Sequence, residues 1–520
     1  MRRALVTGVA LLASACAVGP NFRAPPTPPA AAGKFAAADD GVFSADALPA
    51  DWWRLYDDPV LDGLIAQAFA ANTDLRVATA NLRRARAILS ETRSQLLPST
   101  TISASANYLR STATSGSGGL STPTTGASTG GGTGGAAGGA GGTGTGAGGT
   151  SGSDTTTGLT SGTYQGGFYS LGLDASYELD LYGRVRRDIE ASRADVAASA
   201  AQRDAVRVSV AAETARAYAD ACSAAREGEV AQQTLKLQIQ TFDLTERLAG
   251  AGRGTPLDVA RARAQLEQTR ATLPQFITNR RTALFRLSVL TGHPPEDVPP
   301  GGAACTVAPT IRRPLPVGDG TAMIRRRPDI RQADRTLAAA TARIGVATAD
   351  LYPQISLGAS VGSSAISLGG LDNKSGFRFN VGPLLSWTFP NFTVARARIR
   401  QAEAANESAL ASFDGTVLNA LQETDTALAG LAGELARQQS LIAARDLSAE
   451  AARIVQLRYT AGAENFLAVL DAQRTLAESE AALANSQAAL TTGQVAVFQA
   501  LGGGWETAEP DPTLSKVTHP

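Results

Sequence analysis

Strict alternation of apolar and polar residues predicts β-strands in two stretches of the chain. The apolar side chains recur at every second position, which is the period of a strand with one apolar and one polar face. They are Tyr169, Leu171, Leu173, Ala175, Tyr177, Leu179 and Leu181 in the first stretch, and Phe377, Phe379, Val381, Leu385, Trp387 and Phe389 in the second. Weaker alternation over residues 100–108 and 355–361 supplies a partner strand for each. We therefore predict two hairpins, whose apolar faces suit either lipid or the core of a soluble sandwich.

A very long helix is predicted after each hairpin. Residues 184–249 and 394–461 contain no proline, and at ~1.5 Å per residue each would reach ~100 Å if unbroken. Both end in a glycine-bearing turn, and a returning helix follows over 256–290 and 466–501. The first of these returning helices has an interior proline, Pro274. The chain therefore contains two helical hairpins that need neighbours along their whole length.

Shorter helices are predicted before the hairpins, over residues 62–97 and 322–352. Each stops at a proline, Pro98 or Pro353, because proline cannot continue a helix. The order helix, strand, strand, long helix, returning helix therefore occurs twice along the chain.

The two halves also align residue by residue. The segment from Leu75-Arg76 to Pro98 matches Ile330-Arg331 to Pro353 at an offset of 255, and Glu213-Thr214 matches Glu423-Thr424 at an offset of 210. The offset falls because the first half carries an insertion rich in Gly, Ser, Thr and Ala, which we expect to be a disordered extracellular loop. The predicted domains are a first repeat over 51–310 with this loop at 111–163, a second repeat over 311–505, and a disordered tail over 506–520.

The N-terminus predicts export and lipidation. Two arginines precede an apolar run over 4–13 that is too short for ~30 Å of hydrocarbon, so we interpret 1–15 as a signal peptide. Small residues lead into Cys16 as in a bacterial lipobox, which would make Cys16 the first mature residue, carrying diacylglycerol and palmitate. The alternative is ordinary signal cleavage beside an incidental cysteine. Ala17 is not the aspartate that commonly retains such lipoproteins at the inner membrane, which favours the outer membrane. Residues 16–50 are then a lipid-anchored tether, which we expect to run extended over the surface.

Four strands per chain are too few for a closed barrel, and an open sheet edge in lipid leaves backbone groups without partners. Several copies must therefore pool their strands. Three copies would provide about twelve strands around a water-filled lumen, continued by a helical tunnel, although the arithmetic also allows two or four copies. The predicted fold is mainly α, with a trimeric twelve-stranded membrane barrel.

Composition argues against nucleic acid binding and against catalysis. Lys+Arg 47 balance Asp+Glu 47, so there is no basic excess to attract a nucleic acid. Only two histidines occur, and no acid, base and nucleophile can be placed on facing elements, so we predict neither an enzyme nor a metal site or cofactor.

Several motifs in order resemble the TolC-like outer-membrane efflux proteins, in the NodT-type lipoprotein branch that serves RND tripartite systems. They are Cys16-Ala17-Val18-Gly19-Pro20-Asn21-Phe22, Trp52-Trp53-Arg54-Leu55-Tyr56-Asp57-Asp58-Pro59-Val60-Leu61, Arg458-Tyr459-Thr460-Ala461-Gly462 and Phe466-Leu467-Ala468-Val469-Leu470-Asp471-Ala472-Gln473. The resemblance implies a homotrimer in outer-membrane lipid with a periplasmic tunnel that docks on a periplasmic adaptor and an inner-membrane RND-type pump. Its function would be passive export of small molecules such as drugs or other toxic compounds. The alternative is an adhesive or structural stalk.

A gate is expected at the glycine turns, where an empty tube must be closed. Asp471 lies about 9 Å up the returning helix, and threefold symmetry would repeat it as an acidic ring that favours cations. Leu467, one turn nearer the tip, would form an apolar ring. In the family these positions match the constriction acid and leucine, but Ala468 stands where some members have a second acid. Alternatively, Asp471 pairs with Arg458 or with Arg261, its equivalent in the first repeat.

The turns themselves are candidate adaptor contacts, through Gly252, Thr255 and Leu257 in one hairpin and Gly462 with Leu467 in the other. Helix capping is the alternative role for these residues. Cys222 and Cys305 lie at similar heights and would be exported to an oxidising compartment. A disulfide and two free thiols both remain open from the sequence.

Overall fold

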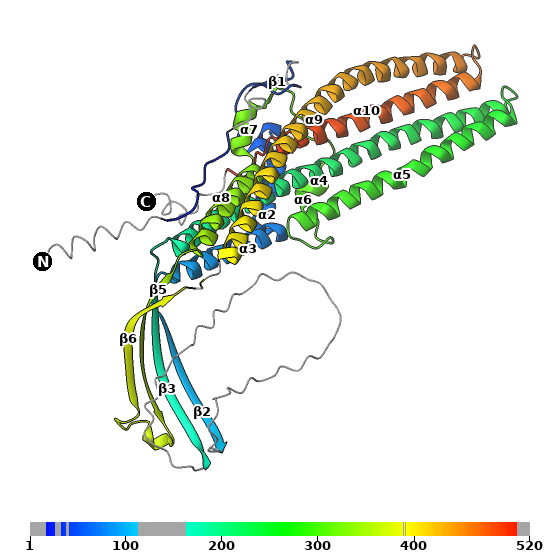
Figure 1. Cartoon of the computed structure of the whole chain (residues 1–520). Coiled ribbons are helices and arrows are strands. Elements are labelled where there is room, and N and C mark those ends of the chain that lie inside the picture. The colour runs from blue at the N-terminus through cyan, green and yellow to red at the C-terminus, as the bar shows by residue number, and fades with distance from the viewer. Residues whose placement is uncertain are drawn as a thin grey trace. The chain divides into compact units, whose positions relative to one another are not determined.

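The computed structural model describes residues 17–26, 33–37, 41–112, 163–387, 389 and 392–506. The chain divides into two compact units (Figure 1). We call residues 98–179 with 355–385 the strand unit and the remainder of the chain the helical unit. The predicted signal peptide, Cys16, residues 113–162 of the predicted loop and residues 507–520 of the predicted tail lie outside the described residues.

The strand unit is one four-stranded sheet with the order β2-β3-β5-β6. Its strands are β2 (Ser99–Thr112), β3 (Thr163–Leu179), β5 (Gln354–Ala365) and β6 (Phe377–Ser386), which confirms the four predicted strands. The alternation predicted strands that reach Leu181 and Phe389, but β3 and β6 end before Leu181 and Trp387. Antiparallel pairing of β2 with β3 and of β3 with β5 sets Leu173 opposite both Ile102 and Val361. Strands β2 and β3 also continue into both ends of the range 111–163 that was predicted as loop.

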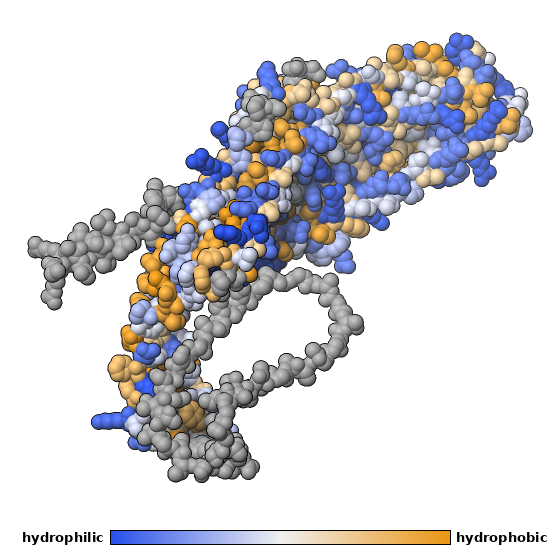
Figure 2. Space-filling view, viewed as in Figure 1, coloured by the Kyte–Doolittle hydropathy of each residue, from blue (hydrophilic) through white to orange (hydrophobic). Residues whose placement is uncertain are grey.

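Large apolar side chains of the strand unit are exposed in the single chain. Ile102, Phe379 and Val381 are 76%, 76% and 75% exposed, and orange side chains follow the visible edge of this unit in Figure 2. Soluble monomers rarely expose apolar surface of this extent, so the sheet needs an apolar surrounding.

The first predicted helix is broken in two. It forms α2 (Pro59–Ala71) and α3 (Thr73–Ser94), with Asn72 between them. The Asn72 side chain accepts from the backbone N–H groups of Asp74 and Leu75 and donates to the carbonyl of Leu290 at 3.2 Å. A single continuous helix was therefore the wrong prediction, because the Asn72 side chain caps a new helix where the periodicity shows no break.

The equivalent helix of the second half is broken at Arg327. It forms α7 (Gly320–Arg326) and α8 (Pro328–Ala349), and Pro328 is the first residue of the second piece. Proline lacks the N–H that a continuous helix needs but is well suited to a first helical position.

The helical hairpins agree with the prediction. They consist of α4 (Arg184–Gly250) with α5 (Pro256–Leu290) and α9 (Phe392–Thr460) with α10 (Phe466–Ala500), and their turns lie at the same end of the helical unit in Figure 1. Helix α4 packs against α3, α5, α8 and α10, whereas α9 packs against α8 and α10. Ala211, Ala212 and Ala217 on α4 are fully buried, since small side chains let neighbouring helices approach closely. None of the described helices has the length and apolar character that a membrane span requires.

The tryptophan-rich motif closes the main core of the helical unit. Trp52, in the short 3-10 helix η2 (Trp52–Tyr56), is fully buried and stacks on Phe498 of α10 at 4.8 Å between ring centroids. Asp58 caps α2 and accepts a hydrogen bond from the Tyr218 hydroxyl at 2.9 Å. The motif thus joins the segment before α2 to both α4 and α10.

Part of the predicted tether also packs into this core. Phe35 and Leu48 are only 4% and 6% exposed, and β1 (Phe43–Ser44) pairs in parallel with β4 (Leu315–Pro316). The expectation that 16–50 runs over the surface is therefore wrong for these residues. Two isolated apolar side chains give no periodic signal, yet both belong to the main buried cluster.

Cys222 on α4 and Cys305, which follows the short helix α6 (Pro300–Ala304), are joined in a disulfide with Cα atoms 5.0 Å apart. Cys222 is completely buried. The bond ties the linker between α5 and α7 to the long helix α4, across a sequence separation of 83 residues.

Replacing Cys222 and Cys305 together with alanine is expected to lower the free energy of unfolding by on the order of 4 kcal/mol, because a long loop is no longer closed in the unfolded chain. Thermal unfolding followed by circular dichroism in detergent, in comparison with untreated and reduced wild type, measures this loss. Equal midpoints for all three samples would contradict a stabilising bond.

Candidate functional site at the helical turns

The two turns that end α4 and α9 have the same backbone geometry. Each contains a glycine in the left-handed region, with φ of 74° at Gly252 and 77° at Gly462. The residue after each glycine donates back to a carbonyl five positions earlier, as in a Schellman motif. These bonds are Arg253 N to Leu248 O and Ala463 N to Arg458 O, both 2.8 Å. Both turns are therefore compact, fixed ends rather than open loops.

The returning helices begin with side-chain caps. Thr255 and Asp258 form a reciprocal capping box at the start of α5, and the Asn465 side chain accepts from Ala468 N at 2.9 Å at the start of α10. Capping was the alternative role for Gly252, Thr255 and Gly462, and these three residues do form the turns. Leu257 remains 56% exposed and is free to contact a partner.

Substituting Gly252 or Gly462 with alanine is expected to cost roughly 1–2 kcal/mol, because a Cβ is unfavourable in the left-handed region. Gly250 is the matched control, since it is the last residue of α4, has no positive φ and has open space around its Cα. Gly250→Ala should be neutral or slightly stabilising. Thermal unfolding measures all three variants, and equal effects at 250 and 252 would refute the conformational explanation.

An apolar cluster lies beneath the turns. Tyr459, Phe466 and Val469 are buried together with Ala262 of the first hairpin. The rings of Tyr459 and Phe466 are 5.9 Å apart. The two hairpins therefore share a small core near their ends, which fixes the height of the residues that follow.

The predicted gate residues lie on exposed surface just beyond this core. Leu467 is 55% exposed, and Asp471 and Arg261 are also exposed. Within the described residues no ion pair joins Asp471 to Arg261 or to Arg458, which pairs with Glu464 at 3.4 Å instead. Asp471 is thus directed at solvent in the single chain, next to the buried Val469.

Gln473 ends one of the motifs quoted above, but the sequence predicted no role for it. Its side-chain NH2 donates to Thr241 of α4 at 2.8 Å and to Gln456 of α9 at 3.3 Å. Its Oε1 is buried without a hydrogen-bond partner among the described residues. The side-chain amide of Gln473, two residues after Asp471, therefore links α10 to α4 and α9. A single polar residue in a helical sequence does not indicate such a role.

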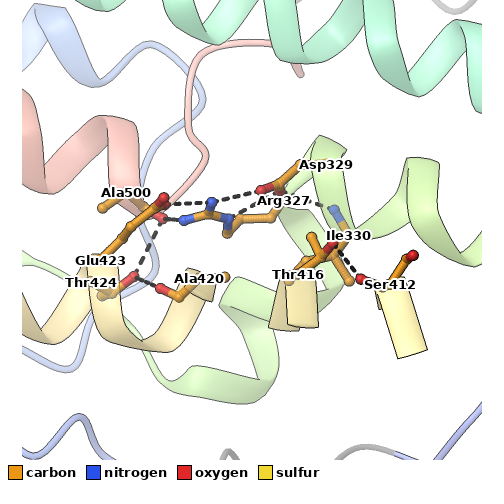
Figure 3. A network of polar contacts seen from close by, with 9 residues as sticks. All are labelled: Arg327, Asp329, Ile330, Ser412, Thr416, Ala420, Glu423, Thr424 and Ala500. Carbon is orange, nitrogen blue, oxygen red and sulfur yellow. Dashed lines mark hydrogen bonds and ion pairs between the residues drawn. The ribbon is translucent and has the colours of Figure 1, made fainter. Parts of the chain in front are cut away.

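Arg327 was also missed, although it lies at the centre of a polar network in the helical unit (Figure 3). Its guanidinium donates to the Ala500 carbonyl at 2.7 Å, to both oxygens of Asp329 and to Glu423 at 2.8 Å. Burial lowers the pKa of Arg327, but the hydrogen bonds and charges of Asp329 and Glu423 outweigh burial and leave it raised. The network fixes the end of α10 against α8 and α9.

The residues that directly follow Cys16 are held by Arg187 of α4. The Arg187 side chain, which is 5% exposed, donates to the carbonyls of Val18 and Gly19 and to the side chain of Asn21. Gly19 has a φ of 91°, and a Cβ there would lie 2.5 Å from the Cα of Gly345. Residues 18–21 therefore have a defined path, which no local pattern predicted.

Comparison with known proteins assigns the chain to a family. The family described as "Outer membrane efflux protein" matches residues 143–293 and 321–503. The outer membrane protein OprJ of Pseudomonas aeruginosa is 30% identical over 96% of this chain and 95% of its own length. Nodulation protein T of Rhizobium leguminosarum bv. trifolii is 28% identical over 95% of this chain and 96% of its own length.

Among solved structures, the outer-membrane channel OprN superposes with a TM-score of 0.80 at 35% sequence identity, and the match covers 94% of this chain and all of the OprN chain. The long helical hairpins, the four-stranded sheet and these matches agree with the resemblance inferred from the motifs. The chain belongs to the outer membrane efflux protein family.

Proposed function

We propose that the protein is the outer-membrane channel of a tripartite efflux system, a passive conduit and not an enzyme. The observation that carries the proposal is that one chain combines a sheet of exposed apolar side chains with two helical hairpins of unusual length. Neither part is stable alone in water, since the sheet needs lipid and the hairpins need neighbours. Membership of the family supports the same function and gives no support to an adhesive stalk.

The proposed assembly is a homotrimer. Three copies of the strand unit would close a barrel of about twelve strands in the outer membrane, and three copies of the helical unit would form the periplasmic tunnel. The duplicated halves, the first and second repeats over 51–310 and 311–505, would then place six similar units around one axis. Cys16 would carry diacylglycerol and palmitate, and the Arg187 contacts to residues 18–21 would hold that lipid anchor at a fixed point on the helical unit.

The turns are proposed as the closed end and as the surface for partners. Asp471 and Leu467 of three copies would form an acidic ring and an apolar ring, and Arg261 would lie at the equivalent height in the first repeat. The exposed Leu257 and the capped turns around Gly252, Thr255 and Gly462 would contact a periplasmic adaptor, which joins the channel to an inner-membrane RND-type pump.

Small toxic molecules are the proposed cargo. The names of two relatives from Pseudomonas putida describe antibiotic efflux and toluene efflux, each with 28% identity to this chain. A passive tube selects mainly by size and lining charge, so this chain would pass what its pump delivers.

Single-channel recording of the purified mature protein in a planar bilayer tests the conduit. We expect small, cation-selective openings that divalent cations block from the side of the helical turns. Heat-denatured protein at the same concentration is the control. A preparation that is trimeric and inserted but never conducts would overturn the proposed function.

A further inference from the structure

The helical unit has two unlike edges. Helix α4 lies between α3 and α8, so both of its sides are covered. Helix α9 packs against α8 and α10 but leaves Leu418 64% exposed, and a Cβ added at Gly415 or Gly433 would meet nothing within 4 Å. At the opposite edge, α3 exposes Val77 by 60%. An open face of α9 and an open face of α3 are therefore available to a partner.

The two halves use the same contacts at the offsets of the sequence repeat. Asn72 donates to the Leu290 carbonyl, and Arg327 donates to the Ala500 carbonyl. The donors are 255 positions apart and the acceptors 210, which are the two offsets of the alignment. Helices α3 and α5 thus relate to α4 as α8 and α10 relate to α9. The open face of α9 then corresponds to the face of α4 that α8 and α10 cover.

One ion pair within the chain marks that covered face. Arg331 of α8 lies 3.8 Å from the carboxylate of Asp204 on α4, and Asp204 is 4% exposed. Applying the same offsets to this pair gives Arg76 on α3 and Asp414 on α9. Both are exposed, and neither makes an ion pair within the described chain. An arginine and an aspartate thus occupy equivalent positions at the two open edges.

The cleft beside Arg76 is lined by several basic residues. Arg76 lines a cleft of about 780 Å³ together with Arg83, Arg203 and Arg207, and no acidic residue lines this cleft. Arg203 is bonded to Asp204, but the buried Nε of Arg207 has no hydrogen-bond partner among the described residues. Asp204 balances the charge of Arg203, but the exposed Arg76 and Arg83 leave the edge of the cleft positively charged. An incoming carboxylate would therefore be attracted to this edge.

We propose that Arg76 of one copy pairs with Asp414 of the next copy, across an interface that repeats the internal contact between α8 and α4. The partner that contacts the cleft beside Arg76 is therefore a second copy of this chain. Because α3 meets α9 and the two faces differ, the contact is heterologous and propagates around a ring until it closes. The number of copies in this inference rests on the proposed function. The new element is the pair of residues that aligns each copy with the next.

Charge reversal tests the pair. Arg76→Asp or Asp414→Arg alone places like charges together, and we expect at least about a tenfold rise in the concentration at which half of the chains are assembled. The double variant restores opposite charges and should recover most of the wild-type assembly. Arg193→Asp is the matched control, since this exposed arginine lies on α4, away from both edges. Analytical ultracentrifugation in detergent measures all five proteins.

Cross-linking gives a second measurement that does not depend on the strength of the pair. With Cys222 and Cys305 already bonded, a short bis-maleimide should join Arg76→Cys to Asp414→Cys and yield covalent species of several chains. Arg193→Cys with Asp414→Cys should yield none. One outcome is that wild type assembles and conducts while the single variants assemble equally well and the double variant shows no recovery. In that case the proposed ion pair is refuted, and the proposed function is not. If wild type stays monomeric in every condition, the proposed function fails with it.

Discussion

Replacing Asp471 with alanine is expected to weaken block by divalent cations by about tenfold or more, and to enlarge the openings of the assembled channel. Three carboxylates in a ring attract a cation and repel one another, so their removal abolishes the bound cation and the closure that it supports. A loss of ~1.4 kcal/mol in cation binding already accounts for a factor of ten. Single-channel conductance with divalent cations added at the side of the helical turns measures the effect.

Two conservative variants separate charge from space at this position. Asp471→Asn keeps the side-chain size and removes the charge, so it should lose block as the alanine variant does. Asp471→Glu keeps the charge and should retain block. If the asparagine and alanine variants conduct like wild type, Asp471 is not part of the gate, although the protein remains a channel. Within the chain Asp471 is exposed, and its neighbour Leu470 packs against the buried cluster of Tyr459, Phe466 and Val469.

Replacing Arg327 with alanine is expected to lower the free energy of unfolding by about 3 kcal/mol. The change leaves the buried carbonyl of Ala500 without its strongest donor and removes the cation that binds Asp329 and Glu423. Because these interactions raise the pKa of Arg327, the guanidinium stays charged throughout the physiological range and no pH change substitutes for the mutation.

Arg325→Ala is the control for this prediction, because Arg325 lies in α7, two residues before Arg327, and is exposed. Arg327→Lys should recover only part of the stability, since an ammonium group cannot donate in the planar fork that both carboxylates and the carbonyl use. Thermal unfolding in detergent compares the three variants. A midpoint for Arg327→Ala no lower than that for Arg325→Ala would show that the network does not stabilise the fold.

Local patterns predicted most of the elements. Alternation in steps of two predicted the strands, and the absence of proline between glycine turns predicted α4 and α9 with ends that agree with the structure. Such signals survive in the sequence because a strand or helix face is defined by neighbours a few positions apart. Periodicity alone did not predict the breaks at Asn72 and Arg327, although Pro328 is a local signal for the second of them.

The candidate site was predicted in part for the same reason. Gly252, Gly462 and the capping residue Thr255 follow from turn and cap chemistry, which is local. Gln473, Arg187 and Arg327 act through partners far away along the chain, and a lone polar residue in a helix has the same appearance whether it faces solvent or joins three helices.

The sequence by itself determined the periodic elements, the duplication offsets and the acid at position 471, because each is a relation between residue types at fixed spacing. Only the tertiary structure decided which side chains are buried together: Trp52 on Phe498, Cys222 bonded to Cys305, and Arg331 beside Asp204. The physical reason is that side chains far apart in the sequence pack together when their shapes and charges fit. Such contacts leave no fixed spacing in the sequence from which they could be predicted.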